Sequence, residues 1–135
     1  MSEVTRRFTF LIDDKVNLDI EDMLDQTPSQ AEEVLVYLEE LQGDIKLCER
    51  LVDEGYEDQQ IRKVERFRSL QAGKYNAYTV RLWEVDDWRL ITAVDYRQRV
   101  IAILYIMKRN EDYDAQAQAR AIEAFERLGL EQLGR

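Results

Sequence analysis

Cationic and phenolic side chains in the second half of the chain are the residues best suited to chemistry. Arg81 and Arg89 lie on two neighbouring predicted strands, Lys108 and Arg109 follow a third, and Tyr113 comes a few residues later. A guanidinium holds phosphate oxygens in a fixed fork and stabilises charge that develops on phosphorus. A phenol stacks on a base or donates its proton. This set predicts a site for a phosphodiester.

Other kinds of site have little support in the sequence. The chain has no histidine, which removes the usual general base at neutral pH and the commonest zinc ligand. Its single cysteine, Cys48, stands among apolar residues, and we interpret it as a small buried hydrophobe. We interpret the acidic pairs Asp86-Asp87 and Glu111-Asp112 as solvated turn and loop residues, not as metal ligands or paired catalytic carboxylates. No metal site is predicted.

The charge of the chain is unevenly distributed. The net charge is -9, yet residues 1–57 hold 16 acidic and 5 basic residues, whereas residues 58–114 hold 9 acidic and 11 basic residues. The cationic surplus indicates a surface for phosphate or an acidic partner, although ordinary solvated helix faces would give the same asymmetry. The overall acidity argues against unaided, non-specific binding of a nucleic-acid duplex.

The length and the apolar content predict one domain over residues 1–135. An apolar fraction of 45% in 135 residues is enough for a single core without disulfides or metal. The longest uncharged apolar run, Val100 to Met107, is far shorter than the roughly 20 residues of a membrane helix. The N-terminus has no apolar stretch typical of a signal peptide. We therefore expect a cytoplasmic protein with no membrane partner.

Hydrophobic periodicity predicts the elements that position these residues. Residues 6–12 alternate as a short strand, and the acidic extension at about 13–27 is expected to be a surface loop or a weak helical turn. Thr27 and Gln30 form a capping box, so a helix is predicted from there to Gly43. Two further predicted helices, three predicted strands and a last helix complete the chain, over residues 44–54, 58–70, 78–85, 88–96, 99–107 and 115–128.

This order predicts an α+β domain: an antiparallel sheet of about four strands, with helices packed on one face and a C-terminal helix. The other face would be partly open to a ligand. A two-residue hairpin loop at Asp86-Asp87 would pair Glu84 with Arg89 and put Arg81 on the opposite face, whereas a loop of odd length would unite the two arginines. Spacing alone favours the arrangement in which Arg81 and Arg89 lie on opposite faces.

Three passages of the sequence resemble one known family. They are VERFRSLQAGKYNAYTVRL, which runs from a predicted helix into a strand; WRLITAVDY, the next strand; and IAILYIMKRNEDYD, which leads from the last strand to a basic cluster and a tyrosine. With RRFTFLI as a first strand, their order and spacing resemble the RelE/ParE superfamily of toxins from bacterial toxin-antitoxin systems, whose strand YRLxYxV looks like WRLITAVDY. The resemblance covers about residues 60–128 and implies a RelE-like fold.

The resemblance implies a toxin that cuts mRNA in the ribosome without metal or cofactor, by attack of a ribose 2'-hydroxyl on the adjacent phosphorus. Arg89 matches the arginine of the YRL strand, and Arg81 falls where a sheet lysine is common. Lys108 or Arg109 matches the arginine after the last strand, and Tyr113 matches the tyrosine. The expected catalytic residues are Arg81, Arg89, Arg109 and Tyr113, and the expected substrate-binding residues are Lys108, Lys74 and Trp83.

The implied partners are a cognate antitoxin that covers the site or displaces the last helix, and the ribosome with its mRNA. The chain departs from the family pattern because Thr79 and Arg81 stand where a sheet lysine would act as base, and because the chain is acidic. These departures support a second hypothesis, a non-catalytic protein-interaction module such as a gyrase inhibitor or an inactive homologue. A third hypothesis is that the acidic N-terminal segment shields the basic sheet within the same chain.

Overall fold

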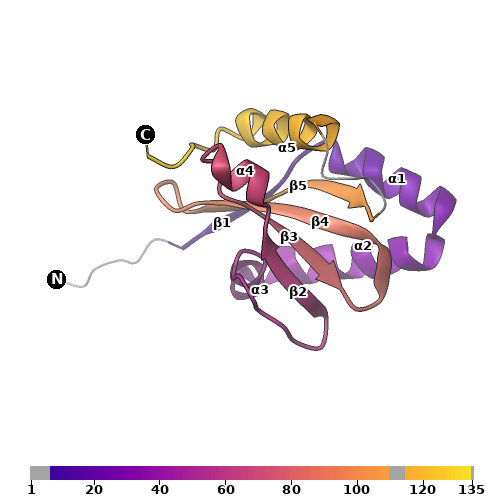
Figure 1. Cartoon of the computed structure of the whole chain (residues 1–135). Coiled ribbons are helices and arrows are strands. Elements are labelled where there is room, and N and C mark those ends of the chain that lie inside the picture. Colours follow the sequence, from indigo (N-terminus) through magenta and orange to yellow (C-terminus); the bar gives the residue numbers. More distant parts are fainter. Residues whose placement is uncertain (1–6, 110–114, 135) are drawn as a thin grey trace.

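The computed structural model describes residues 7–109 and 115–134, which form a five-stranded sheet with helices on both faces (Figure 1). The mixed α+β class is confirmed. In chain order the elements are β1 (Thr9–Ile12), α1 (Val16–Gln26), α2 (Pro28–Gly43), α3 (Ile45–Arg50), β2 (Ile61–Arg66), α4 (Arg68–Ala72), β3 (Ala77–Leu82), β4 (Val85–Asp95), β5 (Val100–Lys108) and α5 (Ala115–Arg127). None of the helices in these two ranges is long and apolar enough to cross a membrane.

The sheet is mixed, with strand order β1-β5-β4-β3-β2. Strands β2 to β5 pair with their neighbours in antiparallel fashion, whereas β1 runs parallel to β5, with Thr9 opposite Val100 and Ile12 opposite Ile103. The prediction of an antiparallel sheet of about four strands is therefore wrong in two respects. The sheet has a fifth strand, β2, and its β1 edge is parallel.

Strand β2 lies in the segment 58–70 that the sequence predicts as a helix. Ile61 and Val64 are three residues apart, as expected on a helix, yet both are buried on one side of the strand. A register shift between Ile61 and Lys63 makes this possible, because an irregularity in a strand changes the usual alternation of side chains. The exposed charged side chains of β2 are typical of an edge strand, where they prevent the unpaired backbone from pairing with another chain.

The acidic stretch 13–27 contains the 11-residue helix α1, which is more than the surface loop or weak helical turn that we expected. Its buried apolar side consists of Val16, Ile20 and Met23. Asp19 is also buried, and its carboxylate accepts a hydrogen bond from the Ile106 backbone N–H at 3.0 Å. Because β1 pairs only with Val100 to Ile103, Asp19 and α1 satisfy part of the β5 edge that β1 leaves open.

Helix α2 has the predicted ends but not the predicted cap. It begins at Pro28 and ends at Gly43. The Thr27 hydroxyl makes no capping bond to α2; it donates to the Met23 carbonyl at 3.3 Å and accepts from the Trp88 indole N–H at 2.9 Å. The Gln30 side chain likewise turns to the sheet. Tertiary contacts with β4 have thus replaced the capping box.

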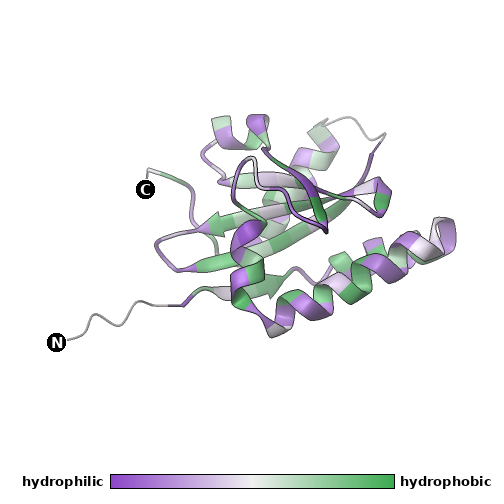
Figure 2. Ribbon diagram, turned by 90° about the horizontal axis from the view of Figure 1, so that it is seen from below, coloured by the Kyte–Doolittle hydropathy of each residue, from purple (hydrophilic) through white to green (hydrophobic). Residues whose placement is uncertain are grey.

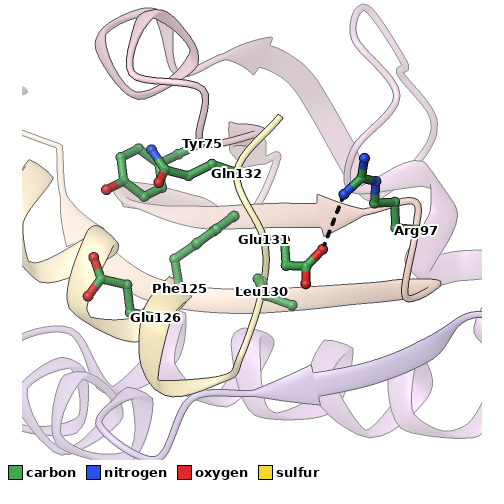
Figure 3. Close-up of a pocket in the computed structure, with 7 residues that line it drawn as sticks. All are labelled: Tyr75, Arg97, Phe125, Glu126, Leu130, Glu131 and Gln132. Atoms are coloured by element: carbon green, nitrogen blue, oxygen red, sulfur yellow. Dashed lines mark ion pairs between the residues drawn. The ribbon is translucent and has the colours of Figure 1, made fainter. Parts of the chain in front are cut away.

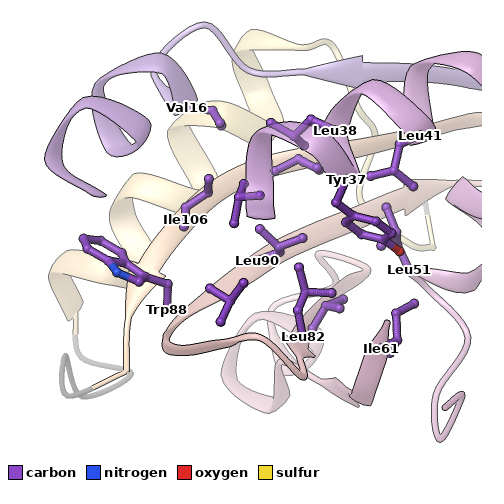
Figure 4. Close-up of a cluster of buried hydrophobic side chains, with 14 of the residues drawn as sticks. Val16, Tyr37, Leu38, Leu41, Leu51, Ile61, Leu82, Trp88, Leu90 and Ile106 are labelled. Carbon is purple, nitrogen blue, oxygen red and sulfur yellow. The ribbon is translucent and has the colours of Figure 1, made fainter. Parts of the chain in front are cut away.

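Two apolar clusters cover the two faces of the sheet. Helices α1, α2 and α3 bury one face, where Figure 4 shows Leu38, Leu41 and Leu90 among the packed side chains. Helices α4 and α5 lie over the other face, with Leu70 and Phe125 in its cluster. In Figure 2 the middle of the sheet is largely hydrophobic and the helices alternate between hydrophobic and hydrophilic residues. The prediction of helices on one face only is wrong, and the face expected to be open is partly covered.

Helix α5 is tied to the acidic N-terminal segment by two arginine–carboxylate pairs. Arg127 binds both oxygens of Asp13, at 2.9 and 3.0 Å, and Arg120 binds both oxygens of Asp19. The Asp13 and Asp19 side chains are only 1% and 5% exposed. These carboxylates therefore neutralise arginines of α5 and not those of the sheet, which does not support the hypothesis that they shield the sheet.

Candidate functional site

Arg81 on β3 and Arg89 on β4 lie on the same face of the sheet. Val80 is opposite Leu90 in the β3–β4 ladder, and both belong to the cluster under α1, α2 and α3. Because side chains alternate along a strand, Arg81 and Arg89, the next residues of each strand, face the opposite side, toward α4 and α5. The structure thus puts on one face the two arginines that the sequence spacing predicted on opposite faces.

The β3–β4 hairpin explains why the spacing was misleading. Leu82 pairs with Val85, so the loop is Trp83-Glu84 and not Asp86-Asp87. The register shifts between Val80 and Leu82, which leaves Asp86-Asp87 as an exposed irregularity at the start of β4. This irregularity changes the parity of the strand and brings the two arginines to one face.

The two arginines differ in exposure. Arg89 is only 9% exposed, and its partner in the β4–β5 ladder is the buried Met107. The Arg81 side chain is 37% exposed. Arg81 therefore presents its guanidinium to solvent, whereas Arg89 adds a positive charge from within the layer between the sheet and α5.

A cavity of about 400 Å³ lies beside Arg81. It is bounded by β2, β3 and the start of α4, and its lining residues are Glu65, Arg66, Phe67, Arg68, Ser69, Thr79 and Arg81. Arg66 is opposite Tyr78, which belongs to the cluster on the other face, and its guanidinium pairs with Glu54 at 3.4 Å. The side chains of Arg68 and Arg81 and one carboxylate therefore provide the charge of the cavity. We call it the Arg81 cavity. A guanidinium fork is suited to phosphate oxygens, and the neighbouring hydroxyl groups of Ser69 and Thr79 are further hydrogen-bonding groups.

Glu65 is the one carboxylate that lines the Arg81 cavity, and it interacts with two cations. Its Oε1 lies 3.1 Å from the Lys63 ammonium and 3.8 Å from the Arg81 guanidinium. All three side chains are between 37% and 56% exposed, and ion pairs at such exposure are worth about 0–1 kcal/mol. The carboxylate therefore holds Arg81 only weakly, and a phosphate can replace it.

The sequence analysis missed the part of this site that comes from β2 and α4. Lys63, Glu65 and Arg68 all fall in the segment 58–70 that was predicted as one helix, so the sequence analysis did not place them beside Arg81. The signal that could have placed them was the alternation around Val64, where the charged Lys63 and Glu65 flank one apolar residue.

Lys108 and Arg109 lie apart from the Arg81 cavity. Lys108 is opposite Trp88 at the end of the β4–β5 ladder, and its ammonium lies 5.7 Å from the centre of the Trp88 ring. Arg109 follows directly, and its backbone N–H donates to the Asp87 carbonyl at 2.7 Å. Trp88 belongs to the cluster under α1, α2 and α3, so Lys108 is on the other side of the sheet from Arg89.

Two further predicted residues, Trp83 and Lys74, do not line the Arg81 cavity either. Trp83 is in the β3–β4 loop, where its indole N–H donates to the Asp58 carbonyl at 2.9 Å and the Arg62 guanidinium lies 5.4 Å from its ring centre. Lys74 follows α4 with a φ of 72°, and its carbonyl accepts from the Leu133 backbone N–H. Tyr113 lies outside the described residues.

A separate hollow, of about 430 Å³, opens near the C-terminal end of α5 (Figure 3). Tyr75 and Phe125 contribute aromatic rings whose centres are 5.1 Å apart, and Arg97 forms an ion pair with Glu131 at 3.7 Å. A second carboxylate, Glu126, also lines this hollow. Two carboxylates with one guanidinium make the hollow unsuitable for phosphate. Within residues 7–109 and 115–134, no group of three or more His, Cys, Asp and Glu could hold a metal ion.

The described residues of the arginine-bearing face are better suited to binding an anion than to moving a proton. Arg81 stands where the resemblance places a lysine, and a guanidinium keeps its proton at neutral pH. Tyr78, the tyrosine of β3, belongs to the cluster on the other face, and its burial raises its pKa above the ordinary value. Glu65 is the carboxylate nearest to Arg81 that could accept a proton.

Comparison with known proteins gives one structural similarity. No model of a protein family matches the sequence, and no curated protein matches it. Among solved structures, the chain is similar to one described as "Crystal structure of archaeal RelE-RelB complex from Pyrococcus horikoshii OT3", with 17% identity and a TM-score of 0.41. The similarity covers 78% of this chain and 99% of that one. The function of this chain therefore has to be inferred from its own residues.

Proposed function

We propose that this chain is the toxin component of a toxin-antitoxin pair and that the sheet face with Arg81 and Arg89 binds phosphate groups of single-stranded RNA. The observation that carries the proposal is the position of both arginines on one face, where Arg81 and Arg68 line a cavity. The strands that hold them, β3 and β4, come from the passages that resemble the RelE/ParE superfamily.

The electrostatics of the cavity support this proposal despite the net charge of -9. Charges on exposed groups are screened by salt over about 8–10 Å, so a bound phosphate responds mainly to the groups next to it. Those groups are Arg68, Arg81 and one carboxylate, and Lys63 pairs with that carboxylate. A local cationic surface can therefore bind RNA on an acidic molecule. An antitoxin would compete with the RNA by presenting acidic residues to the same cavity.

Cleavage of mRNA on the ribosome is the finer form of the proposal. It requires a group that takes the proton of the ribose 2'-hydroxyl while cations stabilise the charge on phosphorus. Tyr113 is the residue that the resemblance offers for this role, and Glu65, 3.8 Å from Arg81, is a second candidate. Either residue would act together with Arg81 and Arg89.

One observation favours the alternative function, a toxin of this fold that binds its target without cutting RNA. Lys108 and Arg109 line a separate cavity and not the Arg81 cavity, so the described members of the expected catalytic set do not gather around one point. Binding needs only the Arg81 cavity, whereas the cleavage implied by the resemblance needs the whole set. Both functions share the same cationic face.

Binding is tested with a labelled 10-nucleotide single-stranded RNA and fluorescence anisotropy at low salt. Arg81→Ala should weaken binding about tenfold, because a charge-assisted hydrogen bond contributes about 1.5–3 kcal/mol. The matched control is Arg97→Ala, which also removes an exposed arginine from an ion pair, and which should change the affinity less than about twofold. Absence of binding by the unaltered chain, or equal losses in the two variants, would overturn the proposal.

The toxin assignment is tested by conditional expression in a bacterium, with transcripts mapped at the same time. Growth arrest with cut transcripts supports the nuclease, and both effects should be lost in Arg81→Ala. Growth arrest with intact transcripts supports the non-cutting alternative. Normal growth with a folded, soluble chain contradicts both forms of the toxin proposal.

A further inference from the structure

We infer that two copies of this chain pair through β1, edge to edge and antiparallel, so that their two sheets become one continuous sheet. This inference goes beyond the proposed function and does not depend on it. Strand β1, Thr9–Ile12, forms one edge of the sheet and pairs with β5 on its inner side (Figure 1). The inferred interface is the outer side of β1 together with the residues that flank this strand.

The outer side of β1 carries backbone groups that can pair with another strand. The Thr9 backbone N–H donates to the Arg99 carbonyl at 2.7 Å, and the Asp13 backbone N–H donates to a carbonyl of β5 at 3.0 Å. Because backbone groups alternate in direction along a strand, the N–H and C=O groups of Phe10 and Ile12 point away from β5. Within residues 7–109 and 115–134, these outward groups have no hydrogen-bond partner.

The two edges of the sheet differ in how they are protected from association. Strand β2 has charged side chains at its exposed positions, and the loop before it covers part of its backbone, where the Gly55 N–H donates to the Val64 carbonyl at 2.9 Å. Strand β1 has the uncharged sequence TFLI, and its three apolar side chains are partly exposed. An apolar edge strand without charges pairs readily with another strand. Association is therefore expected at β1 and not at β2.

The charges on either side of β1 make this strand complementary to itself. The sequence is RRFTFLIDD over residues 6–14, with arginines before the apolar residues and aspartates after them. Antiparallel pairing puts the arginine end of one copy beside the aspartate end of the other, and the two-fold axis repeats this contact. Parallel pairing would put like charges together. The pattern therefore favours a second copy of the chain as the occupant of this edge, in the antiparallel direction.

The outward backbone groups limit the register of the paired strands. These groups belong to Phe10, to Ile12 and, by the same alternation, to Phe8, so these residues have to lie opposite one another. Pairing Phe10 with Phe10 puts Phe8 opposite Ile12 and uses all three residues of each copy. Arg7 then lies opposite Asp13 of the second copy. A register shifted by two residues leaves one of the three without a counterpart.

A hollow of about 700 Å³ beside β1 can receive the acidic end of the second copy. Among the described residues, its charged lining consists of three cations and two carboxylates, which are Arg7, Lys46, Arg99, Asp44 and Glu49. Asp13 is bound to Arg127 of its own chain, so the exposed Asp14 is the carboxylate that reaches this hollow. One added carboxylate balances the charge of the hollow, and the same contact forms on both sides of the two-fold axis.

Sedimentation velocity of the full chain, between about 50 μM and 1 mM, tests for the dimer. We expect a weak monomer–dimer equilibrium, because strands of four residues make an interface smaller than the roughly 1,200 Å² of stable complexes.

Amide hydrogen exchange of the ¹⁵N-labelled chain then identifies the strand and its register. The Phe10 and Ile12 N–H groups should exchange more slowly at the higher concentration, since pairing with a second copy gives them acceptors. The Thr9 and Asp13 N–H groups already have acceptors in the single chain and serve as the internal reference. A dimer with no change at Phe10 and Ile12 uses another surface, and this result would overturn the inference.

Charge reversals test the antiparallel contact between Arg7 and Asp14. Arg7→Glu and Asp14→Lys, each alone, place like charges at both ends of the paired strands and should raise the dimer Kd about tenfold. A mixture of the two variants should dimerise with about the original Kd, because each variant supplies the charge that the other lacks. The matched controls are Arg62→Glu on β2 and Asp25→Lys on α1, which change the net charge equally at exposed positions and should alter the Kd less than about twofold.

Each result supports or contradicts the inference. Slower exchange at Phe10 and Ile12, together with dimerisation that the mixture restores, supports the β1 dimer. A chain that stays monomeric at 1 mM leaves the edge to a strand of another protein and contradicts the inference. Loss of dimerisation that the mixture does not restore contradicts the antiparallel contact. RNA binding is measured separately and depends on Arg81, so the proposed function can fail or stand independently of these results.

Discussion

Glu65 controls the charge of the Arg81 cavity at the scale of single residues. Its carboxylate lies between Lys63 and Arg81 and occupies the place where an oxygen of a bound phosphate would contact both cations. Because these side chains are well exposed, their ion pairs are weak and exchange readily. Glu65 thus acts as an internal competitor that lowers the affinity for anions without blocking the cavity.

Replacing Glu65 by glutamine should tighten RNA binding. The change frees Lys63 and Arg81 while it keeps the size of the side chain, and we expect a gain of up to about fivefold at low salt, equivalent to at most about 1 kcal/mol. Anisotropy with the 10-nucleotide RNA measures the effect. The control Glu39→Gln removes the same charge from an exposed position on α2, across the sheet. An equal gain in both variants would mean that only the net charge matters.

The buried thiol of Cys48 makes a second prediction at this scale. Cys48 is fully buried, and its burial raises the pKa of the thiol to about 12. Since the thiolate is the reactive form, the native chain should resist alkylation by iodoacetamide at pH 8, and urea should restore the reaction. Mass spectrometry of the labelled chain checks this. Rapid labelling of the folded chain would contradict the buried, unreactive role that both sequence and structure indicate.

At the scale of elements, α5 is held by its arginines as well as by its apolar side. Arg120 binds Asp19 and lies 4.1 Å from the centre of the Tyr105 ring, and Arg127 binds Asp13. The carboxylates belong to α1 and to the residues just before it, so these bonds join the two ends of the chain. The layer over the Arg89 face therefore depends on the acidic N-terminal segment.

Arg120→Ala should destabilise the chain by about 3 kcal/mol, because it leaves the buried carboxylate of Asp19 without its cation. Glu123→Ala is the matched control: it removes an exposed partner of Lys15 on the same helix and should cost less than about 1 kcal/mol. Urea unfolding gives both free energies. Similar small losses in the two variants would show that Asp19 is satisfied without Arg120.

The pair between Asp13 and Arg127 predicts a pH dependence of stability. Burial acts to raise the pKa of Asp13, but hydrogen bonds from Arg127 and from the Lys15 backbone N–H outweigh it, so the pKa lies below the ordinary value. A lowered pKa in the folded chain stabilises it above the unfolded pKa of about 3.9, and this stability is lost as pH falls through the folded pKa.

Asp13→Asn therefore tests the pair through its pH profile. The difference in unfolding free energy between the unaltered chain and the variant should be constant from about pH 5 to 7 and should shrink as pH falls below about 4. Urea unfolding at pH 7, 5 and 3 measures it, and the other carboxylates cancel in the comparison. A difference that persists unchanged at pH 3 would show that the charge of Asp13 is not what stabilises the fold.

At the scale of the whole molecule, an acidic protein carries its cationic groups in several separate hollows. Arg81 lines one of them, Lys108 and Arg109 line another, and Arg7, Lys46 and Arg99 line a hollow of about 700 Å³ together with Asp44 and Glu49. Long-range attraction of a polyanion is weak for such a molecule, so binding has to come from a few close phosphate contacts.

This arrangement predicts a shallow salt dependence of RNA binding. With about three phosphate contacts, the slope of log K against log salt for the single-stranded RNA should be about -2, and a duplex of the same length should bind more weakly. Anisotropy at several salt concentrations gives the slope for both ligands. A steep slope, or equal affinity for the duplex, would indicate a continuous cationic surface, which separate hollows do not provide.

The sequence by itself determined the elements whose pattern is local and regular. It placed α2, β3, β4, β5 and α5 within a few residues of their ends, and it identified Cys48 as a buried residue, because each of these depends on a nearby run of apolar residues. The cationic surplus of the second half was equally visible, since charge can be counted without knowing the fold.

Only the tertiary structure decided which residues share a face. The irregularities in β2 and β4 change the alternation of side chains. Ile61 and Val64 therefore have the spacing of a helix, and a regular hairpin predicts Arg81 and Arg89 on opposite faces of the sheet. Helix α1 formed in an acidic stretch because Arg120 and the β5 edge satisfy the carboxylate of Asp19. Contacts between residues far apart in the chain determine strand register, strand irregularities and buried ion pairs. The local periodicity of the sequence does not indicate these contacts.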